Sequence, residues 1–97
     1  MQINTIPKRK RIKLSPDKYR KLCLQVLRRD AYTCQLCRVY TQSPPHHVKY
    51  RSQGGDDCAS NLITLCERCH GDVHNARVSK QVVEDIVARI NERGQVL

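Results

Sequence analysis

Residues 66–74 read CERCHGDVH, a stretch in which two cysteines and two histidines fall within nine positions. Cys66 and Cys69 have the spacing of zinc ligands, while His70 and His74 lie one helical turn apart and share one face of a helix. Neighbours on a helix point about 100° apart because one turn takes ~3.6 residues, so Cys69 and His70 face different directions. We therefore expect the cysteines and the histidines to bind two different metal ions.

A second cysteine pair completes the first metal site. Cys34 and Cys37 repeat the same spacing, and 28 residues separate Cys37 from Cys66. Four thiolates around Zn²⁺ form a closed tetrahedral site that adds folding free energy. The alternatives are disulfides, or a site made from residues 66–74 alone that leaves the first pair without a role. The spacings favour a structural zinc bound by the four cysteines, and loss of one ligand should loosen or unfold the domain.

The histidine doublet His46-His47 lies between the two cysteine pairs. The doublet begins a run that suits a β-strand, and strand side chains alternate, so the two rings should point to opposite faces. One ring can then join His70 and His74 as the third ligand of the second ion. The other ring is suited to take a proton from water near pH 7. We expect Asn61 to fix the tautomer of that ring through its amide oxygen.

The net charge of +9 is concentrated near the N-terminus. Residues 1–29 hold ten Lys or Arg and one acid, a net of +9, whereas residues 30–97 hold eight of each sign, a net of zero. Such a segment attracts a polyanion such as DNA or RNA, because each neutralised phosphate releases counterions. A solubilising tail or an import signal would carry the same charge. The cations expected to bind nucleic acid in this segment are Lys8, Arg9, Lys10, Arg11 and Lys13.

The composition limits the chain to one small domain with a thin core. The 97 residues include no Trp and no Phe, and a core this poor in large aromatic side chains needs a metal, disulfides or a partner. We divide the chain into a flexible basic arm over residues 1–14 and one domain over residues 15–97. The arm lacks the apolar run of a secretory signal, so a reducing, cytoplasmic compartment is expected. No segment is apolar enough to span a membrane.

A capped helix is predicted over residues 16–29. Ser15 is a suitable N-cap, and Pro16 suits the first helical position. The apolar residues of the helix fall on one stripe, and its Lys and Arg residues lie largely off that stripe, so the helix can present positive charge outward. Cys23 falls on the apolar stripe and is interpreted as a packed thiol and not as a ligand.

The remaining patterns predict a small α+β fold. Extended segments are expected at 46–50 and 61–65, and a helix at 70–75. A last amphipathic helix follows Ser79 and ends near Gly94, which suits a C-terminal cap. Its predicted apolar face is made of Val82, Val83, Ile86, Val87 and Ile90.

The combination of ligands resembles the motif of the HNH endonucleases, of the subgroup with added Cys-x-x-Cys pairs. The residues that carry this resemblance are His46, His47, Asn61, Cys66, Cys69, His70 and His74. It covers about residues 31–76, nearly half of the chain, and includes Gly54 and Gly55 in the loop. The resemblance implies a ββα-metal, treble-clef-like core, in which a β-hairpin packs on a helix around one catalytic divalent ion. Helices at both ends and the structural zinc would support this core.

The resemblance also implies a role for each site residue. His47 would be the general base that activates water, and Asn61 would orient it or brace the loop. The ligands of the catalytic ion would be His46, His70 and His74. Arg51 would help to hold the phosphate. On this pattern the protein cleaves double-stranded DNA by one-metal-ion general-base catalysis and leaves 3′-hydroxyl and 5′-phosphate ends.

One position departs from the family pattern, because many members carry Asp where this chain has His46. Three imidazole ligands resemble the colicin-type DNases, which hold transition metals tightly, so the catalytic ion is left open among Zn²⁺, Ni²⁺, Mn²⁺ and Mg²⁺. A non-catalytic zinc module that binds DNA or protein is an alternative, and cleavage of RNA is a weaker one because an aromatic stacking platform is lacking. A monomer and a homodimer are both compatible with the sequence. Small HNH proteins are common in phages and mobile elements, which suggests such a setting.

Overall fold

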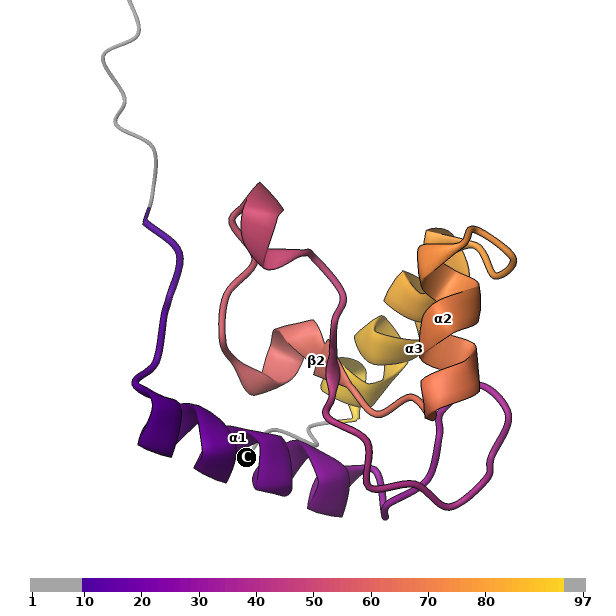
Figure 1. Cartoon of the computed structure of the whole chain (residues 1–97), viewed down its shortest axis with the longest axis horizontal. Coiled ribbons are helices and arrows are strands. Elements are labelled where there is room, and N and C mark those ends of the chain that lie inside the picture. Colours follow the sequence, from indigo (N-terminus) through magenta and orange to yellow (C-terminus); the bar gives the residue numbers. More distant parts are fainter. Residues whose placement is uncertain (1–9, 94–97) are drawn as a thin grey trace, which may run out of the picture.

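The structure, a computed structural model, describes residues 10–93 (Figure 1). Its α-helices are α1 (Pro16–Arg29), α2 (Glu67–His74) and α3 (Lys80–Glu92), and its strands are β1 (His46–His47) and β2 (Leu62–Ile63). The strands and α2 follow one another along the chain, while α1 precedes them and α3 follows them. This is the small α+β arrangement that the sequence predicts, a ββα core with two flanking helices. Within residues 10–93, no helix is long and apolar enough to cross a membrane.

Helix α1 begins and ends where its sequence predicts. The Ser15 side chain accepts a hydrogen bond from the Lys18 backbone N–H at 3.4 Å, and Asp30 is the C-terminal cap. Cys23 is half-buried and shares a hydrogen bond with Tyr19, so it is packed within the domain. The buried residues of the apolar stripe are Leu22, Val26 and Leu27.

A buried ion pair fixes the end of α1 on the second half of the domain. The Arg29 guanidinium binds the Asp30 carboxylate through two hydrogen bonds of 2.8 and 2.9 Å. It also donates to the backbone carbonyls of Ala59 at 2.8 Å and Leu62 at 2.7 Å. Asp30 accepts a further bond from the Thr64 backbone N–H at 3.0 Å. The two side chains are only 1% and 2% exposed, so each depends on the other to compensate its charge.

The two strands pair antiparallel over two residues each, with His46 opposite Ile63. The first strand is shorter than the predicted segment 46–50 because the chain turns back on itself directly after it. Gly55 allows this turn, since a Cβ atom at that position would lie 1.8 Å from the carbonyl oxygen of Lys49. A side chain cannot be accommodated there without moving the backbone.

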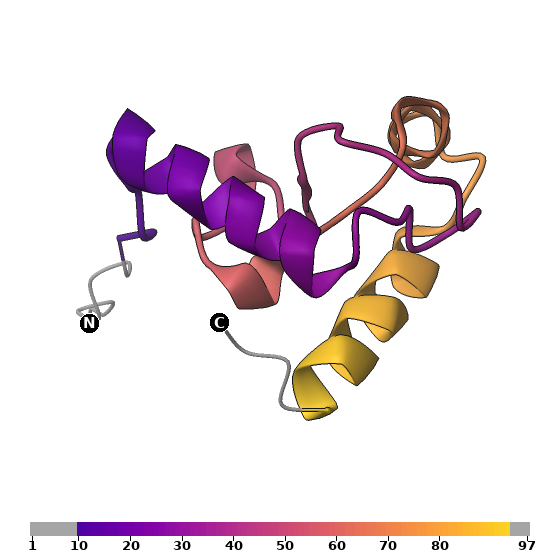
Figure 2. The ribbon, with the colours of Figure 1, turned by 90° about the horizontal axis from the view of Figure 1, so that it is seen from below.

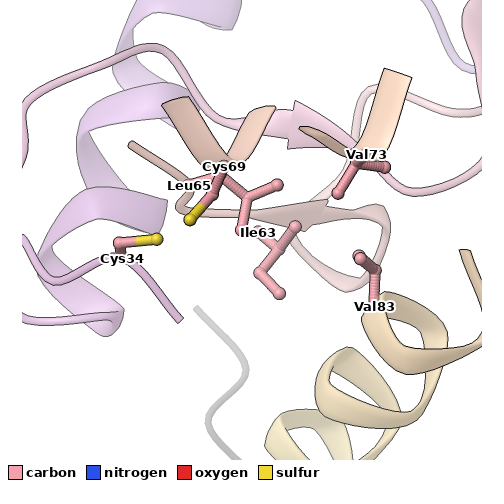
Figure 3. Packing of buried hydrophobic residues seen from close by; sticks show 6 residues of the cluster. All are labelled: Cys34, Ile63, Leu65, Cys69, Val73 and Val83. Carbon is pink, nitrogen blue, oxygen red and sulfur yellow. The ribbon is translucent and has the colours of Figure 1, made fainter. Parts of the chain in front are cut away.

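Strand β2 is buried on both faces, and its two residues belong to two different hydrophobic clusters. Leu62 packs with Leu22 and Val26 of α1. Ile63 faces the opposite way, into a cluster formed with Cys34, Leu65, Cys69, Val73 and Val83 (Figure 3). Because side chains alternate along a strand, each side of β2 contributes one of these residues. The strand therefore joins α1 to the C-terminal half of the domain.

Helix α2 begins earlier than the predicted segment 70–75. The Cys66 thiol caps the helix by accepting a hydrogen bond from the Cys69 backbone N–H at 3.4 Å. Cysteine is not among the usual capping residues, so the sequence pattern predicts a start that is too late. The earlier start puts Cys69 within α2, directly before His70.

Helix α3 is capped by Ser79, as predicted, and runs down from the loop after α2 in the view from below (Figure 2). Its buried residues are Val83, Val87 and Ile90. Val82 is predicted on the same apolar face, but it is 43% exposed, because it lies one position, about 100°, round the helix from Val83. The predicted cap at Gly94 lies outside the described residues.

The last residues of the predicted basic arm, residues 1–14, lie against the loop that follows β1. Residues 1–9 are outside the described part of the chain. The Ile12 backbone N–H donates to Asp56 Oδ1 at 2.6 Å, and the Ile12 carbonyl accepts from the Asp57 backbone N–H at 2.8 Å. These bonds connect Ile12 to the loop of the domain.

Candidate metal centres and catalytic cleft

The four predicted zinc ligands gather into one cluster. The Sγ atoms of Cys34, Cys37, Cys66 and Cys69 all lie within 4.8 Å of one another. Cys37 Sγ and Cys66 Sγ are 3.6 Å apart, close to the ~3.8 Å expected for a tetrahedron of ~2.3 Å zinc–sulfur bonds. The sulfur atoms of Cys34 and Cys69 point toward each other in Figure 3. The donor set fits a structural Zn²⁺, and the inclusion of Cys34 and Cys37 argues against a site built from residues 66–74 alone.

The first cysteine pair is held in a tight turn. Thr33 and Tyr40 form an antiparallel bridge on either side of it. Within the turn, the Cys34 N–H donates to the Val39 carbonyl at 2.8 Å, and the Arg38 N–H donates to the Cys34 carbonyl at 2.9 Å. Arg38 adopts a left-handed conformation with φ of 71°. This backbone turns both thiols toward the second cysteine pair.

The three predicted ligands of the second ion also lie together. His46 from β1 and His70 and His74 from α2 have ring nitrogens within 4.8 Å of one another. The Nε2 atoms of His70 and His74 are 2.9 Å apart, near the ~3.0 Å that two ~2.1 Å metal–nitrogen bonds at right angles would give. Burial, followed by the charges of His70, His74 and His47, lowers the pKa of His46 to about 4. His46 is therefore neutral at pH 7, as a metal ligand must be.

Tyr50 contacts the histidine cluster and Lys80 contacts Tyr50, and neither residue was predicted from the sequence. The Tyr50 ring stacks on His74, with 5.2 Å between centroids, and meets His46 edge-on at 5.8 Å. The Lys80 ammonium of α3 lies 4.6 Å from the Tyr50 ring centroid. Tyr50 therefore contacts two histidines of the cluster and a cation. No spacing rule links Tyr50 to Lys80, because the contact depends on how α3 packs.

His47 points away from the histidine cluster, as strand alternation predicts. Its Nε2 atom lies 2.9 Å from Asp57 Oδ1. Its ring stacks on Tyr19 of α1, with 5.9 Å between centroids and 12° between planes. The doublet thus divides into one ring within the histidine cluster and one ring beside a carboxylate.

Asp57 is a site residue that the sequence analysis did not find. Its side chain is 2% exposed and accepts hydrogen bonds from Arg11 Nη1 and from the Leu14 backbone N–H, each at 3.1 Å. Burial alone would raise the pKa of Asp57. The bonds from His47, Leu14 and Arg11, with the charge of Arg51, outweigh burial and hold that pKa at about 2. The carboxylate is therefore ionised at neutral pH.

The Asn61 amide forms hydrogen bonds with the loop after β1 and not with the His47 ring. Its Oδ1 accepts from the Lys49 backbone N–H at 2.9 Å. Its Nδ2 donates to the carbonyls of Lys49 and Asp56, each at 3.0 Å. These contacts match the loop-bracing role, one of the two expected for Asn61. The hydrogen bond to the His47 ring that was expected from Asn61 is formed by Asp57 instead.

The three-histidine cluster and His47 line the same cleft. This cleft has a volume of about 310 Å³ and is lined by Pro45, His46, His47, Tyr50, Arg51, Ser52, His70 and His74. A second cleft of about 290 Å³ is lined by Arg11, Lys13, Leu14, Pro16, Tyr19, Arg51 and Asp57. Arg51 belongs to both, and its guanidinium lies 4.6 Å from the Tyr19 ring centroid. The second cleft carries three cations against one carboxylate.

The cations of the basic arm that were predicted to bind nucleic acid differ in their exposure and contacts. Lys13 and Lys10 are exposed, and Lys13 borders the second cleft. Arg11 is tied to Asp57 and is only 20% exposed at its side chain. Lys8 and Arg9 lie outside the described residues.

Comparison with known proteins gives one family match and two similar proteins. The family model described as HNH endonuclease matches residues 34–76. The chain is 37% identical over 46 residues to the Type IV methyl-directed restriction enzyme EcoKMcrA of Escherichia coli (strain K12), which covers 47% of this chain and 17% of that protein. It is 33% identical over 64 residues to Anaredoxin of Nostoc sp. (strain PCC 7120 / SAG 25.82 / UTEX 2576), which covers 65% of this chain and 84% of that protein. The chain thus spans a small part of the first protein and most of the second. No solved structure matches.

Proposed function

Because this chain belongs to the HNH endonuclease family, we propose that it is a metal-dependent endonuclease that hydrolyses phosphodiester bonds of double-stranded DNA. The observation that carries the proposal is the composition of one cleft. It contains a three-histidine cluster and, separately, a fourth histidine that is bound to a buried carboxylate. A binding module has no need of this second arrangement.

His46, His70 and His74 would hold the catalytic ion, for which Zn²⁺, Ni²⁺, Mn²⁺ and Mg²⁺ are compared in the assay below. When bound, a divalent ion supplies positive charge that stabilises the scissile phosphate and its leaving oxygen. Burial lowers the pKa of His46 and that of His70, so both rings favour the neutral form that binds a metal. Nitrogen ligands favour the transition metals over Mg²⁺.

His47 would act as the general base. It lines the same cleft as the histidine cluster but has no part in that cluster. A neutral imidazole there takes a proton from the attacking water, which adds to phosphorus while the 3′ oxygen leaves. The products are a 3′-hydroxyl and a 5′-phosphate.

Arg51 would bind the substrate backbone where the two clefts meet. Its side chain is 49% exposed, so the guanidinium can reach a phosphate oxygen. Lys13 and Arg11 line the second cleft, and Lys10 precedes them along the arm. Lys8 and Arg9 would extend this basic path. Such contacts position the backbone without specifying a sequence.

The experiment compares the intact protein with His47→Ala on supercoiled plasmid, in the presence of Mg²⁺, Mn²⁺, Ni²⁺ or Zn²⁺. We expect the intact protein to nick or linearise the plasmid with at least one metal. The variant should lose about 10²- to 10⁴-fold in rate, the usual contribution of a general base. A matched control is Lys49→Ala, which removes an exposed cation two residues further along the chain.

The metal content of both proteins separates the proposal from a non-catalytic zinc module. Two ions per chain, with a large rate difference between the proteins, support the nuclease. One ion per chain held by the cysteines, with plasmid binding but no cleavage by either protein, would replace the proposal with the binding module. The same assay with a single-stranded RNA of equal length tests the substrate class.

A further inference from the structure

The carboxylate of Asp57 joins the catalytic cleft to a segment outside the matched family region. We propose that Asp57 is a positioning residue that fixes the tautomer and orientation of His47, and that residues 11–14 hold Asp57 in place. The inference rests on the proposed function, because it assigns His47 the role of base. It adds that the active site of this chain is completed by its N-terminal segment.

Both oxygens of Asp57 are engaged from two directions. Oδ1 lies 2.9 Å from His47 Nε2 and 3.1 Å from Arg11 Nη1, and Oδ2 accepts from the Leu14 backbone N–H at 3.1 Å. Arg51 Nε approaches Oδ1 at 3.5 Å. With its side chain 2% exposed, the carboxylate depends on these partners and has little water to replace them. Its position is therefore set by the arm as well as by its own loop.

This contact decides which nitrogen of His47 carries the proton. An ionised carboxylate can only accept hydrogen bonds, so Nε2 must be the donor. A neutral imidazole has one N–H, which leaves Nδ1 with the free lone pair. The stacking of the ring on Tyr19 restrains its rotation out of this plane. The nitrogen that takes the proton from water is therefore Nδ1.

Further hydrogen bonds hold the arm on the loop that carries this carboxylate. Ile12 bonds to the Asp56 side chain and to the Asp57 backbone, and Arg11 Nη1 also donates to the Gly55 carbonyl at 3.0 Å. None of these residues contributes to the histidine cluster, whose members come from β1 and α2. Loosening the arm should therefore disturb the base and spare the metal site.

Three variants test the inference on the full chain loaded with Zn²⁺. Asp57→Ala removes the acceptor for Nε2, and Asp57→Asn keeps an oxygen without the charge. Asp85→Ala is the matched control, because it makes the same substitution at an exposed residue of α3, whose carboxylate accepts a hydrogen bond from Gln81. We expect kcat to fall about 10- to 100-fold for Asp57→Ala and less for Asp57→Asn, with KM and the two bound ions unchanged. Asp85→Ala should retain most of the activity.

Nitrogen-15 NMR of the histidine rings supplies a readout that does not depend on cleavage. At a pH of about 8, where an ordinary imidazole is neutral, intact His47 should show protonated Nε2 and unprotonated Nδ1. In Asp57→Ala the ring should lose this preference. Arg11→Ala is a further variant, which weakens the hold on Asp57 and leaves the Asp57 carboxylate itself intact. It should shift the His47 signals in the same direction by a smaller amount.

The outcomes distinguish this inference from the proposed function. Protonated Nδ1 in the intact protein, or an unchanged kcat and tautomer in Asp57→Ala, overturns the positioning role while the nuclease proposal stands. If the intact protein cleaves nothing but its His47 signals shift in Asp57→Ala, the structural arrangement holds and its catalytic purpose is overturned. If Asp57→Ala does not fold, the Asp57→Asn and Arg11→Ala spectra decide.

Discussion

Cys69 and His70 are consecutive residues of α2, yet their side chains belong to two different clusters that could each hold a metal ion. Cys69 is buried and joins the other three thiols, while His70 turns toward His46 and His74. The two clusters are thus rigidly coupled through one helical turn. A change that moves the start of α2 is expected to affect both.

Loss of a zinc ligand should unfold the domain. Cys37→Ser leaves three thiolates, and a structural zinc contributes about 10 kcal/mol or more, comparable with the whole stability of a small domain. Zinc content and thermal melting followed by circular dichroism measure the effect. Cys58→Ser is the control, because Cys58 lies outside the cluster and contacts Ser60. Equal melting of the two variants would contradict the structural role of the four cysteines.

Zinc binding at the cysteine cluster should weaken as the pH falls. The ligands must be thiolates, so each proton added to the free cluster competes with the ion. In the metal-free cluster, burial raises the pKa of Cys69 to about 12, so metal binding must displace a proton from this thiol even at neutral pH. Titration with a zinc-sensitive dye at several pH values should show higher affinity at higher pH. A pH-independent affinity would argue against thiolate ligands.

Removal of a histidine ligand should empty the second site without unfolding the protein. His74 is exposed at the end of α2, so His74→Ala leaves no cavity in the core. We expect the number of bound ions to fall from two to one. The melting temperature should change little, because the zinc site of the four cysteines is intact. His47→Ala is the control and should retain both ions. A variant that keeps two ions would show that the three imidazoles do not form the second site.

Two glycines should respond to the same substitution in opposite ways. Gly55→Ala places a Cβ atom 1.8 Å from the Lys49 carbonyl oxygen and should destabilise the hairpin. Gly71→Ala meets open space on α2 and should stabilise the protein by about 0.5–1 kcal/mol, because alanine is the better helix former. Urea unfolding of the two variants measures both effects. Similar free energies of unfolding would mean that the loop tolerates a side chain.

The left-handed Arg38 in the cysteine turn offers a stabilising change. Its φ of 71° strains a residue with a Cβ atom, so Arg38→Gly should raise the free energy of unfolding by about 1 kcal/mol. Arg38→Ala is the matched control, since it removes the same side chain and keeps the strain. Urea unfolding at saturating zinc isolates the backbone effect. A gain in both variants would assign the effect to the side chain.

Adjacent arginines at the end of α1 should differ sharply in importance. Arg29→Ala leaves the Asp30 carboxylate buried without its partner and should cost about 3–5 kcal/mol. Arg28→Ala removes an exposed cation from the same helical turn and should cost less than about 0.5 kcal/mol. Chemical unfolding of both variants checks the contrast. Equal losses would mean that the ion pair does not stabilise the fold.

The features that depend on spacing could be predicted from the sequence. Ser15 and Pro16 marked the start of α1, and the two cysteine pairs predicted one cluster because ligand chemistry requires them to meet. The alternation of side chains along a strand was enough to separate His46 from His47. In each case a local rule or a ligand requirement fixed the answer.

The missed features depend on contacts between distant parts of the chain. Asp57 meets Arg11 and Leu14 only because the arm folds onto the loop, and no periodicity links these positions. Tyr50 meets Lys80 only once α3 has packed. The short strand β1 has a similar origin, since the predicted length was overridden by the backbone turn around Gly55.

The two-faced burial of β2 limits how far this protein can be dissected. Leu62 is covered by α1, which lies outside residues 34–76, the region matched by the family. A fragment cut to that region would expose an apolar side chain in the middle of its hairpin and would lack the Arg29 contacts to Ala59 and Leu62. Such a fragment is expected to aggregate even with zinc present. A transfer of this motif into another protein must therefore include α1, or provide another apolar surface that covers Leu62.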